Sequence, residues 1–193
     1  MIATRIQISS VECKRHRLID AYALHKFIYS LFPKLEDEAR DFLYLDKGER
    51  EGLRQVLIFS HRWPLGLPYG VADSREIPKE IVNFDSYRFS VRLNPVIRSN
   101  AVAKPIRGSE AIQSWFLGKT SSWGFAVVSG TLSQSGISIQ QVQKGNDIIM
   151  QQSVVFSGIL EVENRTLFVN SFTDGIGRSK GFGFGLLEIV PIE

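Results

Sequence analysis

Twice along the chain, a run in which apolar and polar residues alternate gives way to a helix with one apolar side, and then to further alternating runs. Alternation with a period of two is typical of a half-buried strand, and a period near 3.6 is typical of an amphipathic helix. In the first half the helix is expected from Leu18 to Phe32, and Pro33 ends it. The strands expected around this helix cover residues 2–8, 42–45, 55–60 and 81–84, with a long loop at 61–79.

The second half repeats the order, beginning with a strand at 87–94. A basic, proline-containing link leads from this strand into a helix near residues 109–119. The pattern predicts an α+β protein with an N-terminal domain at residues 1–84 and a C-terminal domain at 85–193. Domains of this size have marginal cores, so the halves are expected to pack on each other or on a partner. Further elements are expected at 124–130, 137–142, 154–162 and 186–190 (strands) and near 165–173 (a short helix).

Composition narrows the class of protein. With 44% hydrophobic and 22% charged residues the chain is globular, and a formal charge of +3 permits nucleic-acid binding without requiring it. A single cysteine, Cys13, excludes an internal disulfide, and together with three histidines it offers no zinc-type cluster, so no metal site is expected. The acidic stretch at 36–41 is expected to be a solvated face. The sequence shows neither a signal peptide nor an apolar span of ~20 residues, which predicts a cytoplasmic protein without a membrane partner.

Five glycines alternate with other residues near the C-terminus, around two cations. Glycine lets the backbone approach a ligand closely, so that successive N–H groups and neighbouring cations can hold a phosphate. The order of residues matches neither a Walker A loop nor a Rossmann turn. The pattern predicts a phosphate-binding loop, and the alternative is that the glycines only let a loop pass close to the sheet. The residues concerned are Gly175, Gly177, Arg178, Ser179, Lys180, Gly181, Gly183 and Gly185.

On the first expected helix, Tyr22, His25 and Tyr29 follow one another at i, i+3 and i+7 along one margin of the apolar side. A histidine there could reach a ligand in the groove between the two halves and transfer protons, as RNA cleavage requires. The alternative is a half-buried packing histidine beside a surface tyrosine. His16 and His61 lie in basic surroundings and are expected to be solvated or to face RNA.

Taken together, these segments resemble the CasE family, the repeat-RNA-processing subunit of the type I-E CRISPR surveillance complex. The likeness runs over nearly the whole chain and includes the helix segment Tyr22–Pro33, the block Ala39–Leu43 and the strand Phe89–Pro95. The glycine-rich loop and closing strand, Gly175–Leu187, are the strongest match. The sequence departs from the family pattern at Ser90, Leu93 and Arg178, and these changes concern RNA affinity or repeat sequence preference more than chemistry. Residues 133–153 are less basic than expected for a segment that holds an RNA stem.

The resemblance implies tandem ferredoxin-like (RRM-like) β-α-β-β-α-β domains and a metal-independent endoribonuclease without a cofactor. Such an enzyme cuts CRISPR repeat hairpins in precursor crRNA by attack of a ribose 2′-hydroxyl, and it keeps the product hairpin alongside other Cascade subunits. By resemblance, His25 is the general acid or base, Tyr22 helps it to position the phosphate, and Lys180 stabilises the negative charge. A subunit that binds the hairpin without cutting it is the alternative. The residues expected to contact RNA are Arg15, Arg17, Arg92, Lys104, Arg107, Gly177, Arg178, Ser179 and Gly181.

Overall fold

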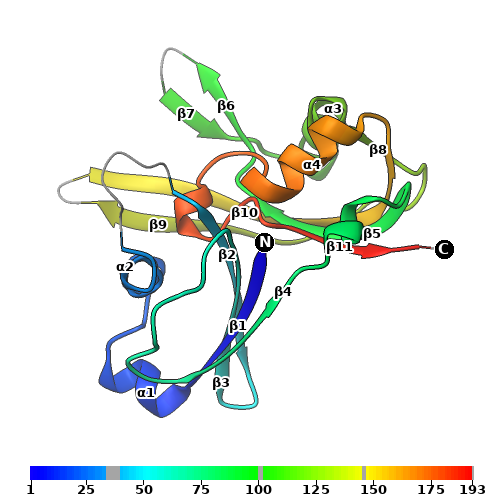
Figure 1. The fold of residues 1–193 in the computed structure, drawn as a ribbon. Coiled ribbons are helices and arrows are strands. Elements are labelled where there is room, and N and C mark those ends of the chain that lie inside the picture. Colours follow the sequence, from blue (N-terminus) through cyan, green and yellow to red (C-terminus); the bar gives the residue numbers. More distant parts are fainter. Residues whose placement is uncertain (34–39, 100–101, 145–146, 193) are drawn as a thin grey trace.

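The computed structural model describes residues 1–33, 40–99, 102–144 and 147–192, so the expected acidic face at 36–41 lies mostly outside the described residues. Within these residues the chain forms two α+β halves, each with its own antiparallel sheet (Figure 1). The first half contains β1 (Ile2–Ser9), α1 (Ser10–Arg15), α2 (Ala21–Ser30), β2 (Phe42–Arg50), β3 (Leu53–Ser60) and β4 (Val71–Glu76). The 3₁₀-helix η1 (Lys79–Val82) ends the first half. The second half contains β5 (Ser86–Leu93), β6 (Val96–Ser99), β7 (Val102–Pro105), α3 (Ser109–Thr120), η2 (Ser121–Trp123), β8 (Phe125–Val127), β9 (Ser133–Lys144), β10 (Asp147–Val162), α4 (Arg165–Asp174), η3 (Lys180–Phe182) and β11 (Leu187–Pro191).

The first sheet has the strand order β2-β3-β1-β4, and neighbouring strands are antiparallel. Ile6 and Ile8 of β1 are fully buried on the same side, because alternate residues of a strand share a face. Helix α2 covers this face with its own apolar side, including Leu24. Asp20 begins the helix by accepting a hydrogen bond of 2.7 Å from the backbone N–H of Ala23. The margin of α2 that carries His25 lies next to the loop that precedes β11.

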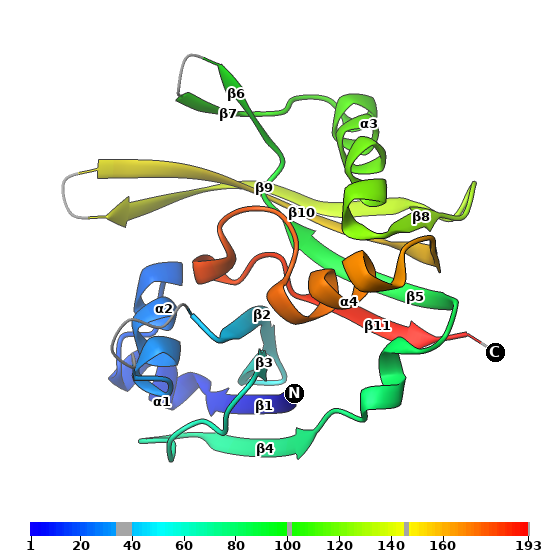
Figure 2. The same ribbon diagram turned by 45° about the horizontal axis from the view of Figure 1, so that its top comes forward.

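The second sheet has the strand order β11-β5-β10-β8, and β9 pairs with β10 in a long hairpin. Strand β5 lies between β10 and β11, just as β1 lies between β3 and β4 in the first sheet. Helices α3 and α4 cover one face, where Phe116 of α3 stacks on Phe156 of β10 with ring centroids 4.2 Å apart. Strands β6 and β7 form a separate hairpin that extends from the end of β5 (Figure 2).

The two halves meet on the side of the first sheet that carries no helices. Leu43 and Leu45 of β2 pack against Leu186, and the ring of Phe59 lies 5.5 Å from that of Phe172 on α4. The segment between α4 and β11 passes between the halves and reaches α2 (Figure 1). The expectation that the halves pack on each other is therefore confirmed.

Two expectations for the first half are wrong. Residues 81–84 do not form its fourth strand, because Lys79–Val82 form a 3₁₀-helix. The fourth strand is β4, which lies inside the expected loop at 61–79 and pairs with β1. Residues 61–70 form no helix, so the first half lacks the second helix of a β-α-β-β-α-β unit.

The remaining elements agree with the sequence pattern more closely. The helix expected at 18–32 exists but is shorter, and the short helix α1, for which no element was predicted, precedes it. In the second half all the expected strands and helices are present with shifted bounds, and the β6–β7 hairpin was not expected. No helix among the described residues is long and apolar enough to cross a membrane.

Candidate active site

His25 is held by the glycine-rich loop that precedes β11. Its ring nitrogen Nδ1 lies 2.6 Å from the backbone carbonyl oxygen of Gly181. Because a carbonyl oxygen only accepts hydrogen bonds, Nδ1 carries a proton and donates it. The nitrogen Nε2 is therefore the one left to exchange a proton with a ligand.

The same carbonyl oxygen of Gly181 has a second donor in the core of the first half. The hydroxyl group of Tyr44, on β2, donates to it at 3.0 Å. Burial raises the pKa of Tyr44 far above its usual value. The phenol therefore keeps its proton and remains a donor, so that β2 and α2 together fix the position of the loop.

Aromatic rings hold the plane of the histidine. The ring of Tyr29 lies 4.1 Å from that of His25 at an angle of 38°, and the ring of Phe182 stacks at 4.9 Å and 22°. One turn earlier on α2, the ring of Tyr22 lies 6.0 Å from that of His25 and is nearly parallel to it. The ammonium of Lys26 lies 4.5 Å from the centre of the Tyr22 ring. The helix thus places the three expected side chains in one row, with Tyr22 at its start.

Two cations flank Gly181. The ammonium of Lys180 donates to the backbone carbonyl of Asp174 at 2.8 Å. Burial lowers the pKa of Lys180, the charge of Arg40 lowers it further, and Asp174 offsets part of this effect. A Cβ atom added to Gly181 would lie 3.3 Å from Arg40 Nη1. The absence of a side chain at this position leaves room for Arg40 Nη1 and for the His25 ring, whose Cε1 would lie 4.0 Å from the added Cβ.

Arg40 was missing from the residues expected in the site. It falls in the block Ala39–Leu43 that carried part of the resemblance, but no role was inferred for it. Its side chain points toward Gly181, where Tyr29 Oη would also lie only 3.1 Å from an added Cβ. No local pattern around Arg40 signals this contact, because it joins residues far apart in the sequence.

The glycines of the loop have two different roles. Gly175 and Gly185 close the loop on itself, with φ angles of 74° and 83° that favour glycine. The backbone N–H of Ile176 donates to the Gly185 carbonyl at 2.9 Å, and a Cβ on Gly185 would lie 2.3 Å from the carbonyl oxygen of Ile176. For these two glycines close backbone packing, the alternative considered above, is what the geometry supports. Gly181 differs, because its carbonyl orients His25.

Part of the loop faces a second region, under the β6–β7 hairpin. Gly177 and Arg178 line a cavity of about 610 Å³ together with Trp115 and Trp123. Both tryptophans also pack against the second core. Ser179 accepts a hydrogen bond of 3.0 Å from the side chain of buried Asn94, which fixes the loop beside β5.

The other residues expected to contact RNA are spread over the surface. Lys104, on β7, and Arg107, just after it, are exposed. Arg15 and Arg17 are exposed at the C-terminal end of α1, which lies far from the β6–β7 hairpin in both views (Figures 1 and 2). The structure therefore brings His25, Tyr22, Lys180 and Gly181 together but leaves Arg15 and Arg17 apart from Lys104 and Arg107.

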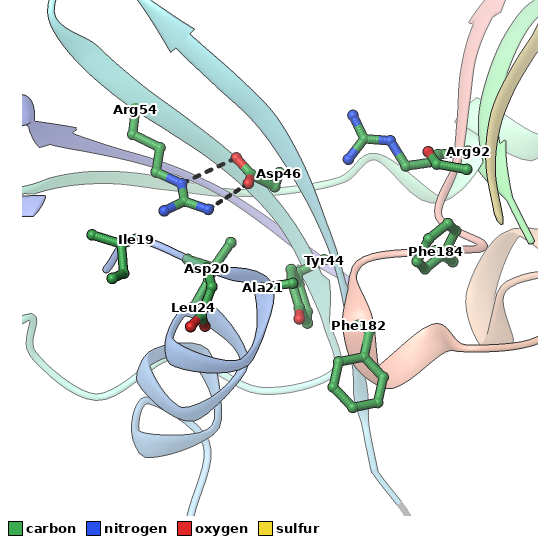
Figure 3. Close-up of a pocket in the computed structure, with 11 residues that line it drawn as sticks. Ile19, Asp20, Ala21, Leu24, Tyr44, Asp46, Arg54, Arg92, Phe182 and Phe184 are labelled. Atoms are coloured by element: carbon green, nitrogen blue, oxygen red, sulfur yellow. Dashed lines mark hydrogen bonds and ion pairs between the residues drawn. The ribbon is translucent and has the colours of Figure 1, made fainter. Parts of the chain in front are cut away.

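A cavity of about 400 Å³ lies between the two halves (Figure 3). Phe182, whose ring stacks on His25, forms one part of its wall. On another part, the guanidinium of Arg54 donates to the carboxylate of Asp46 at 2.7 Å. Arg92, one of the expected RNA-binding residues, reaches into the cavity from β5. The cavity thus has an aromatic side next to the histidine and a charged side away from it.

The remaining histidines and the cysteine lie outside this site. His16 is exposed and stacks on Tyr69 with ring centroids 3.9 Å apart, and His61 is exposed as well. Cys13 is buried with a free thiol. In the parts of the chain that the structure describes, no three His, Cys, Asp or Glu residues are grouped so that they could hold a metal ion.

Comparisons of the sequence and of the structure with known proteins both find CRISPR proteins. The family model described as CRISPR associated protein matches residues 1–191. The CRISPR system Cascade subunit CasE of Escherichia coli (strain K12) is 26% identical over 188 residues, which cover 90% of this chain and 93% of that protein.

Two solved structures share the fold over essentially the full length. The CRISPR endoribonuclease Cse3 bound to a 19-nucleotide RNA has a TM-score of 0.84 and 20% identity, covering 99% of this chain and 100% of its own. The CRISPR-associated protein Cas6e from Escherichia coli K-12 has a TM-score of 0.76 and 20% identity, and both chains are covered completely (100%).

The fold and the family match define an α+β protein of CRISPR systems. The chain belongs to the CRISPR associated protein family. The resemblance to CasE is confirmed by the similarity to the Escherichia coli protein.

Proposed function

We propose that the chain is an endoribonuclease of the CasE type, which cuts repeat stem-loops in precursor crRNA and keeps the product hairpin within a type I-E surveillance complex. The observation that carries this proposal is the hydrogen bond from His25 Nδ1 to the Gly181 carbonyl, which leaves Nε2 as the nitrogen that can exchange a proton. Gly181 follows Lys180 in the chain and lies against Arg40. The names of the relatives support it, since one is a Cascade subunit and another is an endoribonuclease bound to RNA.

The reaction that suits this arrangement is an internal transfer of the phosphate. The ribose 2′-oxygen forms a bond to the adjacent phosphorus and the bond to the 5′-oxygen of the next nucleotide breaks, which yields a cyclic phosphate and a free 5′-hydroxyl. One proton leaves the 2′-hydroxyl and one arrives at the 5′-oxygen, so that no water is consumed. His25 Nε2 takes or gives one of these protons, and Nδ1 stays bound to the Gly181 carbonyl in both its neutral and its charged form.

Three other groups would stabilise the reacting phosphate. Lys180 and Arg40 place positive charge where negative charge builds up on the phosphate oxygens. Tyr22 lies one helical turn from His25 and helps to position the phosphate. This set of side chains provides both proton transfer and charge stabilisation, so the proposed reaction needs no metal ion or cofactor.

The RNA hairpin is proposed to lie over the region between the β6–β7 hairpin and the glycine-rich loop. Exposed Lys104 and Arg107 and the loop residue Arg178 provide positive charge there. Double-stranded RNA is recognised mainly through its shape and backbone, which matches such scattered cations. Arg15 and Arg17 lie elsewhere and would contact a different segment of the RNA.

We also propose that residues 1–84 and 85–193 are tandem ferredoxin-like domains. The equivalent strand orders β2-β3-β1-β4 and β8-β10-β5-β11 support this division. In the second half the order β5, α3, β8, β10, α4 and β11 follows the β-α-β-β-α-β pattern around the added β6–β7 and β9 strands. The first half keeps the strand order with the second helix replaced by an irregular segment.

The test is incubation of the purified protein with the repeat RNA of its own genomic neighbourhood in the presence of EDTA. We expect a single cut at the 3′ base of the hairpin that leaves a cyclic or 3′ phosphate. Loss of activity in EDTA that a divalent ion restores would contradict the metal-independent reaction. Tight binding of the hairpin without a cut would point instead to a non-catalytic RNA-binding subunit.

A further inference from the structure

Arg92 presents a charged group to the space between the two halves. It extends from the face of β5 opposite to the helix-covered core, and it points toward the Asp46–Arg54 pair across the cavity (Figure 3). Among the described residues, its Nε atom is buried and has no hydrogen-bond partner. Leaving a buried donor unpaired costs free energy, which an acceptor from outside would recover.

The carboxylates that act on the charge of Arg92 already have other partners. Asp46 and Glu188 both favour its charged form, against the effect of burial, which lowers the pKa of Arg92. Asp46 pairs with Arg54 at 2.7 Å, and Glu188 pairs with Lys47. Neither carboxylate forms an ion pair with Arg92 in the part of the chain that the structure describes. Its charge is therefore left for a bound anion.

The cavity in front of Arg92 has the size of a site for one small ligand. Its volume of about 400 Å³ falls within the range of such sites. It lies between the two halves, where one unpaired nucleotide fits and a base-paired stem does not. Phe182 both lines this cavity and stacks on His25, so one aromatic ring separates the cavity from the proposed catalytic histidine. Aromatic rings are common stacking surfaces for unpaired bases.

We propose that this cavity binds the first unpaired nucleotide on the 3′ side of the cut, with its base against Phe182 and its 3′ phosphate on Arg92. The inference rests on the proposed function, in which the nucleotide before the cut belongs to the stem and the strand after it is unpaired. The phosphate being cut lies at His25, so the next nucleotide is the one that reaches past Phe182. After cleavage this nucleotide leaves with the 3′ fragment, while the hairpin stays bound by other contacts.

The test compares two RNAs that carry a 2′-deoxy nucleotide before the cut, so that neither is cleaved. One ends at the cut, and the other continues on its 3′ side with the natural unpaired strand. Dissociation constants are measured for wild type, for Arg92→Gln, and for Arg88→Ala, which removes an exposed arginine from the same strand. Arg92→Lys is included because it keeps the charge, and thermal unfolding of all four proteins is recorded.

We expect Arg92→Gln to weaken binding of the extended RNA roughly tenfold, in the range of hydrogen bonds to charged groups, and to leave the short RNA unaffected. Arg92→Lys should recover part of this loss, and Arg88→Ala should bind both RNAs like wild type. Equal weakening of both RNAs, or no weakening of either, would overturn the inference. Failure of the wild type to bind even the short hairpin would contradict the proposed function itself.

Discussion

We expect a methyl group at Gly181 to disturb the proposed active site without unfolding the protein. The φ angle of Gly181 is not positive, so alanine meets no backbone strain there. Its Cβ would lie 3.1 Å from Tyr29 Oη and 3.3 Å from Arg40 Nη1, and these flexible ends would have to move by a few tenths of an ångström. If a shift of 1 Å costs about 100-fold in rate, such a shift costs about four- to tenfold.

The assay is single-turnover cleavage of repeat RNA by Gly181→Ala, together with unfolding in urea. We expect the free energy of unfolding to change by less than about 1 kcal/mol, since the substitution also stiffens the unfolded chain. Gly185→Ala is the contrasting variant, because it combines a φ of 83° with a contact of 2.3 Å to the backbone of Ile176. It should lose at least about 1–2 kcal/mol of stability. Wild-type cleavage by Gly181→Ala would refute the proposed grouping of Tyr29 and Arg40 around this glycine.

Two further predictions concern the neighbours of the histidine. Because burial and Arg40 lower the pKa of Lys180, its charge is lost on raising the pH earlier than that of a free lysine. The cleavage rate of wild type should therefore fall at alkaline pH, whereas the rate of Lys180→Arg should stay constant to a higher pH. If the rates of both proteins fall at the same alkaline pH, this charge has no role in cleavage. Tyr44→Phe removes one of the two donors to the Gly181 carbonyl and should lower the free energy of unfolding, measured in urea, by about 1 kcal/mol. The cleavage rate should fall only severalfold, because His25 still holds the loop. A loss of cleavage as large as that of a histidine variant would show that Tyr44 takes part in the chemistry.

Hydrophobic periodicity predicted most of the elements that contribute to a core and missed strand β4, which does not. Strand β4 joins the first sheet through backbone pairing with β1, and its side chains are mostly exposed, so its sequence has no alternating pattern. The apolar run at 81–84 contains Ile81 and Val82, which are only half-buried in a short 3₁₀-helix. The sequence around helix α1 does carry a local helix signal, the capping box formed by Ser9 and Glu12.

The arrangement of the candidate site was predictable where its residues share one element. The row Tyr22, His25 and Tyr29 follows from helical spacing alone. The glycine-rich loop can be recognised from its high content of glycine. The pairing of His25 with one particular carbonyl, that of Gly181, depends on how the halves pack and has no signal in either segment. The same holds for Arg40, which reaches the loop across the interface.

The central claim is that His25 transfers a proton in the cleavage step. The most direct measurement is the single-turnover cleavage rate of His25→Ala against wild type at saturating protein, in EDTA, with the affinity for the uncut hairpin determined in parallel. The predicted result is a rate lower by about 10²- to 10⁴-fold, as for other positioned acid–base groups, with hairpin affinity close to that of wild type. Cleavage by His25→Ala at the wild-type rate would contradict the claim.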